Sequence, residues 1–187
     1  MDTLVRIHTL PGGRVPTRKT DGAIGYDVSL RAIVCAKEMD VENPRLRKTL
    51  FDFVNMPSDP EVARYVVEKE GKLFYRMDPG ESALGGIGFI TEMEFPLCYS
   101  VEQRSGLSSR FGIIIANAHT FVDPDYRGEA GVVIENRSRV PFDLWHGMRI
   151  AQIIFQNALI PKIVRVESVD DLTTSRRGTG GFGSTGV

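Results

Sequence analysis

Several features that define other protein classes are missing from this 187-residue chain. No apolar run is long enough to span a bilayer, so we expect no membrane-spanning segment. The net charge of −1 provides no polybasic surface for nucleic acid or anionic lipid. The start of the chain lacks the basic residues and long apolar stretch of a signal peptide. We therefore expect a cytoplasmic protein, or one of the host cell cytoplasm if the source is viral.

Residues that form disulfides and metal sites are equally scarce. Cys35 and Cys98 are the only cysteines, and without a CxxC spacing they read as free core thiols in a reducing compartment. Three scattered histidines argue against a histidine-based metal cage. We therefore expect no direct protein ligands for a metal ion.

What remains is typical of one globular β domain over residues 1–187. Charged residues make up 25% and hydrophobic residues 42%, which is ordinary for a protein with a substantial core. Apolar and polar residues alternate over 24–32 and 97–102, which predicts half-buried strands. The runs 132–134 and 150–155 are continuously apolar and predict more deeply buried strands. Because Gly, Pro, Asn and Asp interrupt these runs at short intervals, we predict an all-β sandwich or barrel.

Residues 37–72 break the β pattern and read as an inserted excursion with one helix. Ser58 or Asp59 can cap this helix, Pro60 suits its first turn, and Gly71 follows its expected end. Val62 and Val66 would then lie one helical turn apart and could dock on the body.

The last eleven residues, 177–187, contain five glycines. Such a segment loses much backbone entropy on ordering, so alone it should be mobile. Its glycine N–H groups can converge on phosphate oxygens, while Arg177 adds charged donors and Phe182 an apolar face for a ring. Taken alone, a frayed glycine-rich terminus is the alternative. No Lys and no helix follow the glycines, so the segment is not a P-loop.

Two further segments carry candidate chemistry. Arg104-Ser105-Gly106 follows a strand and predicts a small-residue turn whose N–H groups and Arg104 side chain suit a phosphate chain. Residues 120–128 predict a strand that runs into an acidic turn, where Asp123 could be a general base and Tyr126 could pack under a sugar. The alternatives are a capped surface turn and an Asx-type turn, respectively.

Two polar residues of the predicted strands are also candidates. Gln152 lies inside an apolar run, and its amide needs either a backbone partner or a ligand. Asp27 lies on the polar face of its strand, where it is solvated or paired with an Arg. His119, close to the acidic turn, reads as structural, with contact to a base as the alternative.

Together and in this order, five segments resemble the motifs of the trimeric dUTP diphosphatases (dUTPases). They are residues 22–28, 104–110, 122–129, 147–155 and the tail, which reads Arg-Gly-x-Gly-Gly-Phe-Gly-Ser-Thr-Gly. The resemblance implies a β-barrel or jelly-roll-like subunit, a homotrimer and three active sites shared between subunits. It also implies Mg²⁺-dependent hydrolysis of dUTP to dUMP and pyrophosphate, with Mg²⁺ held mainly by the triphosphate and water.

The resemblance assigns roles to individual residues. Asp123 would deprotonate the water that attacks the α-phosphorus, and Gln152 would bind a phosphate or the water network. Asp27 would place a metal-bound water or an arginine. The substrate-binding residues of the body would be Arg104, Ser105 and the Gly106 backbone on the phosphates, and Tyr126 against deoxyribose. The base-reading hairpin would be His119, Thr120, Phe121 and Val122. Residues 176–187 would form a mobile lid with Arg177, Phe182, Gly183, Ser184 and Thr185 on the substrate.

The sequence also departs from the family pattern. The related dCTP deaminases resemble residues 74–84 and use a Glu on the strand after the acidic turn. The matching position here is Val133, and Glu135 shares its strand face two residues on, so hydrolysis is favoured. Thr120 stands where the base-reading hairpin usually has Gly, which leaves another pyrimidine deoxynucleotide open as substrate. A third reading is a nucleotide-gated regulator that binds a protein partner through residues 37–72.

Overall fold

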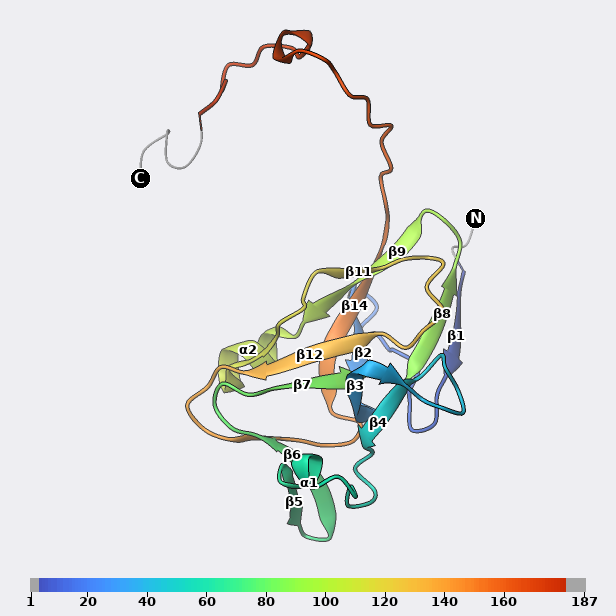
Figure 1. Cartoon of the computed structure of the whole chain (residues 1–187), viewed down its shortest axis with the longest axis vertical. Helices are drawn as coiled ribbons and strands as arrows, with labels where there is room; N and C mark the ends of the chain where they lie inside the picture. The colour runs from blue at the N-terminus through green and yellow to red at the C-terminus, as the bar shows by residue number, and fades with distance from the viewer. Residues whose placement is uncertain (1–3, 181–187) are drawn as a thin grey trace.

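The computed structural model of the protein describes residues 4–180, which form a largely β structure (Figure 1). The strands are β1 (Val5–Thr9), β2 (Tyr26–Ser29), β3 (Ala32–Met39), β4 (Arg47–Phe51), β5 (Val66–Lys69), β6 (Lys72–Met77), β7 (Ser82–Gly86), β8 (Phe89–Met93), β9 (Leu97–Gln103), β10 (Ile113–Ile115), β11 (Thr120–Val122), β12 (Gly131–Asn136), β13 (Phe142–Leu144) and β14 (Arg149–Asn157). The helices are α1 (Pro60–Ala63), α2 (Ser105–Phe111) and the 3₁₀ turn η1 (Val169–Asp171).

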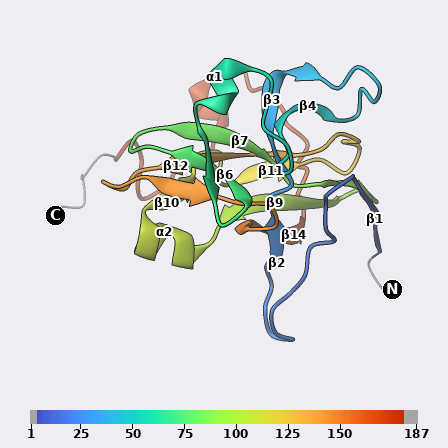
Figure 2. The same cartoon turned by 90° about the horizontal axis from the view of Figure 1, so that it is seen from below.

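Two antiparallel sheets enclose most of the core, and the predicted all-β class is confirmed. One sheet has the order β10-β12-β7-β3-β4, and the other β11-β9-β14-β2. Figure 2 shows β7 and β12 in one layer and β9 in the next. A Cβ atom at Gly85 of β7 would lie 2.7 Å from Leu30 and 3.4 Å from Ile150 of β14, so glycine there lets the layers approach closely.

The segment 24–32, predicted as one strand, is two strands in different sheets. β2 pairs with β14, whereas β3 pairs with β4 and β7. Between them, the Leu30 N–H donates to the Met148 carbonyl (2.8 Å) and the Arg31 N–H donates to the Gly86 carbonyl (2.9 Å). The chain therefore crosses from one layer to the other at these two residues, and an alternating pattern does not reveal such a crossing.

The three other predicted strands are confirmed as β9, β12 and β14, but the predicted burial is wrong for two of them. β9, predicted to be half-buried, is buried on both faces from Leu97 to Val101 because it lies between β11 and β14 inside its sheet. β12, predicted to be more deeply buried, alternates, with Val133 only partly buried between Val132 and Ile134. β9 and β14 pair from Ala151 opposite Gln103 to Asn157 opposite Leu97, which makes them the longest continuous ladder of the fold. The prediction of free thiols also holds, because Cys35 and Cys98 are both unpaired.

The stretch 37–72 contains less helix and more strand than its pattern predicts. Asp59 caps α1 by accepting the Glu61 N–H (2.9 Å), but the helix ends at Ala63. Val66 opens β5 instead of continuing the helix, and Gly71, at φ 71°, forms the tight turn to β6. The predicted helix as far as Gly71 is therefore wrong. β5 joins β6 and β13 in a small sheet at the end of the body away from the tail (Figure 1).

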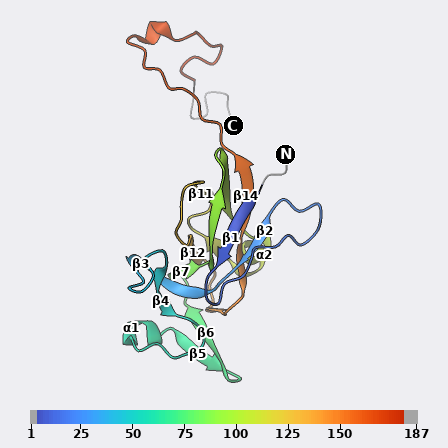
Figure 3. The same cartoon turned by 90° about the vertical axis from the view of Figure 1, so that its right-hand side faces the viewer.

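After β14, the Ala158 N–H still donates to the Pro96 carbonyl (2.9 Å), and the chain up to residue 180 then runs away from the body (Figures 1 and 3). Its described part is exposed almost throughout, although it carries large apolar side chains. Those more than half exposed are Leu159, Ile160, Ile163, Val164, Val169 and Leu172. Within residues 4–180, helices are too short for a membrane crossing.

Candidate active site

Asp27 lies between two arginines at one end of the four-stranded sheet. Its Oδ1 accepts from Arg104 Nε (2.9 Å) and its Oδ2 from Arg149 Nη1 (2.7 Å). Arg104 also donates to the Arg149 carbonyl (3.0 Å). The Asp27 carboxylate is only 16% exposed, against 25% for Arg104 and 47% for Arg149. The predicted ion pair of Asp27 with an Arg is confirmed, and the carboxylate bonds two guanidinium groups at once.

Gln152 lies on β14 directly opposite Asp27 of β2. Its Nε2 donates to the Gln103 carbonyl at 3.3 Å. A Cβ atom at Gly25 would lie 2.3 Å from Gln152 Oε1, so residue 25 leaves the space that the amide oxygen occupies. Gln152 thus has the backbone partner and also lines the open cleft described below.

The residues after Arg104 form a helix, not the predicted turn. α2 begins at Ser105 with Arg104 as its N-cap residue, and the Arg104 side chain makes no capping bond because a guanidinium has no acceptor atom; it donates to Asp27 instead. Ser105 and Gly106 are therefore the first residues of a helix whose N–H groups have no side-chain cap. Both residues line the cleft.

These groups surround an open cleft of about 460 Å³, here called the cationic cleft. It is lined by Lys19, Gly22, Ala23, Ile24, Gly25, Asp27, Arg104, Ser105, Gly106, Arg149 and Gln152. The positive charges of Lys19, Arg104 and Arg149 stand against the single carboxylate of Asp27, three minus one, so the lining carries a charge of +2. A cleft of this charge with fork-shaped donors suits a polyanion such as a phosphate chain.

The predicted acidic turn lies beside a second cavity, of about 290 Å³, here called the turn pocket. Its lining comprises Arg47, Val101, Asn117, Thr120, Phe121, Val122, Asp123, Tyr126, Ala130 and Gly131. β11 and the turn after it are as predicted: the Tyr126 N–H donates to the Asp123 carbonyl (3.2 Å), and the Asp123 side chain is exposed. The Tyr126 hydroxyl donates to the Glu129 carbonyl (3.2 Å). A Cβ atom at Gly128 would lie 2.5 Å from that hydroxyl, so glycine makes room for the ring.

The turn is anchored at its far end by a buried ion pair. Glu129 is fully buried and accepts from Arg31 Nε (2.9 Å) and Arg31 Nη2 (2.8 Å) in a fork-to-fork arrangement. The Gly88 N–H adds a third bond to Glu129 Oε1 (2.8 Å). Because Glu129 also holds the Tyr126 hydroxyl, this pair fixes the position of the Tyr126 ring.

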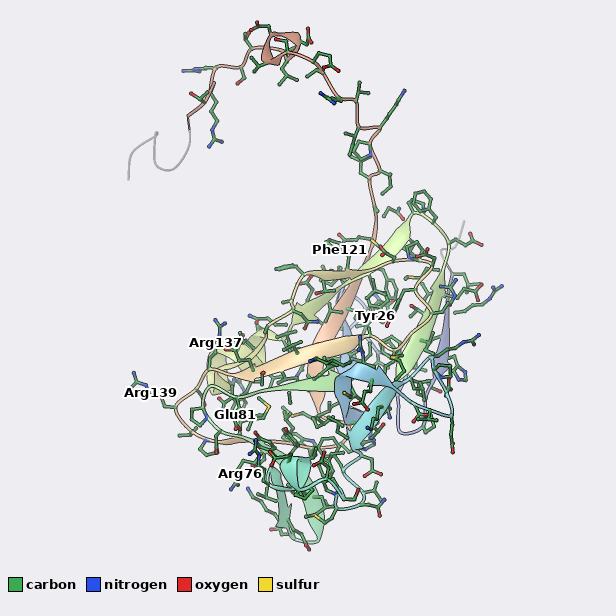
Figure 4. The ribbon with its side chains drawn as sticks, in the orientation of Figure 1. Tyr26, Arg76, Glu81, Phe121, Arg137 and Arg139 are labelled. Carbon is green, nitrogen blue, oxygen red and sulfur yellow. The ribbon has the colours of Figure 1, made fainter. Side chains whose placement is uncertain are left out.

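Of the predicted base-reading hairpin, three residues line the turn pocket and one does not. Thr120, Phe121 and Val122 are in its wall, and Phe121 projects from the edge strand β11 with 57% of its surface exposed (Figure 4). The His119 ring instead lies against Glu102, with Nδ1 3.0 Å from Glu102 Oε2. His119 adopts φ 62°, the left-handed conformation that glycine takes most easily.

Cys98 lies next to the acidic turn. Burial, followed by the charge of nearby Asp123, raises the pKa of the Cys98 thiol. The thiol therefore stays protonated at neutral pH and donates to the Gln156 carbonyl (3.4 Å).

The cationic cleft and the turn pocket are far apart within one chain. Gln152 and Asp27 lie level with Glu102 of β9, whereas Asp123 follows Val122, which lies opposite Tyr99. The strand order β11-β9-β14-β2 puts three strand spacings between Asp123 and Asp27, and two between Asp123 and Gln152. At about 3.3 Å per residue and about 4.8 Å per strand, the longer separation, from Asp123 to Asp27, is about 13 Å along and about 14 Å across, or roughly 19 Å in all. Asp27 and Gln152 are thus together, and Asp123 and Tyr126 are together, but the two pairs are separate.

The predicted lid residues are placed only in part. Arg177 Nε donates to the Gly180 carbonyl at 2.9 Å, within an exposed turn of the tail. Phe182, Gly183, Ser184 and Thr185 lie outside the described residues.

Sequence reasoning missed three basic residues. Arg149 and Lys19 line the cationic cleft, and Arg47 lines the turn pocket. Arg149 lies within the fourth motif, and this motif could have identified it. Lys19 and Arg47 lie outside all five motifs. Among residues 4–180, acidic, histidine and cysteine side chains form no cluster of three or more that could hold a metal ion.

The sequence is similar to known dUTPases. A family model for dUTPase matches residues 99–186. The deoxyuridine 5'-triphosphate nucleotidohydrolase of Chlamydia trachomatis serovar L2 is 41% identical over 108 residues, which are 58% of this chain and 73% of that protein. The enzyme of the same name from Rhizobium rhizogenes is 42% identical over 109 residues, 58% of this chain and 68% of that protein.

The fold is similar to those of staphylococcal phage dUTPases. The Staphylococcus bacteriophage 80alpha dUTPase with dUPNHPP superposes with a TM-score of 0.67 at 19% identity, covering 98% of this chain and 99% of the other. The dUTPase of S. aureus phage phi11 gives 0.60 at 15% identity, covering 90% and 99%. From the extent of the sequence identity, the chain belongs to the dUTPase family.

Proposed function

We propose that the protein hydrolyses dUTP to dUMP and pyrophosphate. The observation that carries the proposal is the cationic cleft, where Asp27 holds the guanidinium groups of Arg104 and Arg149 in fixed positions. Guanidinium groups fixed before binding lose little freedom when they engage a polyanion. Family membership supplies the substrate class.

The phosphate chain would bind in the cationic cleft. Arg104 and the uncapped start of α2, at Ser105 and Gly106, would donate to its oxygens. Gln152 would add a hydrogen bond from the cleft wall. Asp27 is already bonded to two arginines, so its proposed role is to position them and not to hold a metal-bound water.

Asp123 would act as the general base, because its carboxylate is exposed beside the turn pocket. It would accept a proton from a water molecule whose oxygen forms a bond to the α-phosphorus. The bond between the α-phosphorus and the bridging oxygen breaks, and the electron pair leaves with pyrophosphate. Tyr126, fixed through Glu129, would pack against the deoxyribose, and Thr120, Phe121 and Val122 would contact the base.

The separation of the two pockets supports a shared site. A base must lie within about 3.5 Å of the reacting atoms, whereas roughly 19 Å divides Asp123 from Asp27 in one chain. A second copy of the chain would bring its acidic turn to the cationic cleft of the first. The proposed homotrimer would also bury the apolar side chains of the tail, which are exposed in a single chain.

The tail is proposed to cover the bound substrate. Residues 176–187 would act as the lid, with Arg177, Ser184 and Thr185 on phosphate, Phe182 over the base and Gly183 between them. The glycine-rich composition supports this because it allows close backbone approach to phosphate oxygens.

Mg²⁺ is proposed as the cofactor. The described residues fit a cation held by the triphosphate and water, since the one carboxylate of the cationic cleft is saturated by arginines. A metal bound there would offset the charge that develops on the leaving pyrophosphate. Among the relatives by fold, a mutant of the phage phi11 dUTPase is described with a structural Mg(II) ion.

The alternative functions have less support. Val133 occupies the position at which a deaminase needs Glu, and Glu135 is paired with Arg137 Nε at 2.9 Å, away from the turn pocket lining. A different pyrimidine remains a proposal because Thr120 replaces the usual Gly of the hairpin. Protein binding through residues 37–72 also remains a proposal; deletion of this stretch is a poor test because it removes β4 and a pocket residue, Arg47.

The test is a chromatographic product assay with Mg²⁺ on dUTP, dCTP, dTTP and UTP. We expect dUMP and pyrophosphate from dUTP. Conversion of dCTP to dUTP would make the protein a deaminase, and release of dCMP would change the base but keep the chemistry. Asp123→Asn should keep nucleotide binding and lose about 10²–10⁴-fold in turnover, the usual contribution of a general base. The control, Asp125→Asn in the same exposed turn, should keep its rate; equal rates for both variants would remove Asp123 as the base.

A further inference from the structure

The turn pocket has a wall that comes from outside the five motifs. Arg47, the first residue of β4, lines this pocket together with Asp123 and Tyr126. β4 is the edge strand of the five-stranded sheet, and Figure 3 shows the β3–β4 hairpin on the same side of the body as β12. The stretch 37–72 therefore contributes a positively charged side chain to the turn pocket.

The Arg47 side chain is held at one end only. Its Nη1 donates to the Ala36 carbonyl of β3 at 2.9 Å. A Cβ atom at Gly131 would lie 3.5 Å from Arg47 Nε, so the guanidinium lies close over the backbone of β12, with glycine beneath it. This position puts its planar group into the pocket wall.

One N–H donor of the Arg47 side chain has no hydrogen-bond acceptor. Arg47 Nε is the buried side-chain donor that lacks a partner among residues 4–180. A buried donor without an acceptor is destabilising, and native structures usually have a reason to keep one. Because Arg47 also lines the turn pocket, a ligand bound there could supply the missing acceptor.

The backbone near Arg47 is tied to the acidic turn, so the two sides of the pocket form one unit. The Glu129 N–H donates to the Arg45 carbonyl at 3.3 Å. Glu129 also fixes the Tyr126 hydroxyl and is locked by Arg31. Arg47 and Tyr126 therefore keep a fixed relation that a binding site requires.

We propose that Arg47 is a substrate-binding residue that donates a charge-assisted hydrogen bond to an oxygen of the nucleoside. The inference rests on the proposed function, because it takes the turn pocket as the nucleoside site. Arginine is a donor without acceptor capacity. The partner is therefore a carbonyl oxygen of the pyrimidine or the 3′-oxygen of the sugar. A carbonyl partner at C4 would favour uracil over cytosine, whose amino group there is a donor.

The experiment compares Arg47→Met and Arg47→Lys with a matched control, Arg45→Met. Arg45 is exposed, lies two residues away and gives only its backbone carbonyl to Glu129. Loss of a charge-assisted bond should lower kcat/KM for dUTP by roughly ten- to a hundred-fold in Arg47→Met, mainly through KM. Arg47→Lys should fall between, and Arg45→Met should match wild type.

Two further measurements separate binding from structure and identify the acceptor. Affinity for a non-hydrolysable imido analogue of dUTP and the melting temperature without ligand are measured on the same variants. Weaker affinity at temperatures where Arg47→Met is folded supports the proposal; a lower melting temperature with unchanged affinity overturns it. If the loss disappears with 2′,3′-dideoxy-UTP, the acceptor is the 3′-oxygen, and if it persists, the acceptor is on the base.

The failure of this inference can be told apart from failure of the proposed function. Wild type and Arg47→Met binding the analogue equally would overturn the role of Arg47 alone. A wild-type protein that binds and turns over no pyrimidine nucleotide would overturn both.

Discussion

The buried pair of Arg31 and Glu129 gives the sharpest stability prediction. Glu129 accepts three hydrogen bonds and is fully buried, and Arg31 is 7% exposed. Arg31→Met would leave a buried carboxylate with one of its three donors, the Gly88 N–H. Breaking such a pair on one side typically costs about 3–5 kcal/mol of unfolding free energy. For a chain of this size that corresponds to a fall in melting temperature of about 6–20 °C.

The assay is urea unfolding at fixed protein concentration, because any association of copies adds to the apparent stability. The double variant Arg31→Met/Glu129→Leu removes both charges, so it should recover much of the loss and fall short of wild type by about 1–3 kcal/mol, the cost of the orphaned Gly88 N–H. A double variant as unstable as the sum of the two single variants would refute the reasoning, since uncoupled residues add. Turnover should fall with Arg31→Met even when it is folded, because the pair positions Tyr126.

Two other predictions concern packing and pH. A Cβ atom at Gly13 would lie 1.8 Å from the Gly88 carbonyl oxygen, whereas one at Gly22 meets nothing within 4 Å. In thermal unfolding, Gly13→Ala should therefore lose about 3 kcal/mol and Gly22→Ala stay within about 0.5 kcal/mol of wild type; similar values would show that the close approach is not rigid. Burial would raise the pKa of Asp143, but hydrogen bonds from Arg76 and Lys69 outweigh it and hold that pKa below its usual value. A depressed pKa contributes stability above the unfolded value, about 3.9, and this stability is lost as pH falls below it. Asp143→Asn should therefore cost about 1 kcal/mol at neutral pH, discounted for the exposed cations, and progressively less as the pH falls below about 3.9. Urea midpoints of wild type and Asp143→Asn at neutral pH and in acid measure this difference, and a difference that does not change with pH would contradict the ion-pair explanation.

The strands were predictable from the sequence because burial of one or both faces of a strand leaves a recognisable pattern of apolar residues. β14 follows its apolar run, with Ile150, Ala151 and Ile153 buried, whereas β9 is buried on both faces although its sequence alternates. Asp27, placed by alternation on a polar face, has the arginine partners expected for such a carboxylate. These inferences are local, and they hold because tertiary packing reinforces the local pattern.

The helical segments were mispredicted for identifiable physical reasons. Ser and Gly at residues 105–109 favour turns in isolation, but α2 forms because Leu107 is buried at 6% exposure and Gly112, at φ 65°, ends the helix. Beyond α1, the β-branched pair Val66-Val67 forms the start of β5, which pairs with β6, instead of continuing the helix. In both places a tertiary contact outweighed propensity.

The basic residues of the site could not be placed from their own neighbourhoods in the sequence. Arg47 reaches the turn pocket because the β3–β4 hairpin folds against the loop before β12, contacts that span more than 80 residues of chain. Lys19 lies in a loop that Asp27 anchors through a backbone bridge to Thr17. Such placement depends on topology, and a single sequence without its fold carries little sign of it.

The distance between the cationic cleft and the acidic turn also has a genetic consequence. In a trimer that builds each site from two copies, a chain defective at Arg104 still carries an intact acidic turn, and a chain defective at Asp123 still carries an intact cleft. Mixed assembly of these two defective chains regenerates complete sites wherever the intact halves meet. A chain that carries both defects has neither an intact cleft nor an intact turn. Two genes with one defect each would therefore complement one another, whereas a gene with both defects would not function alone.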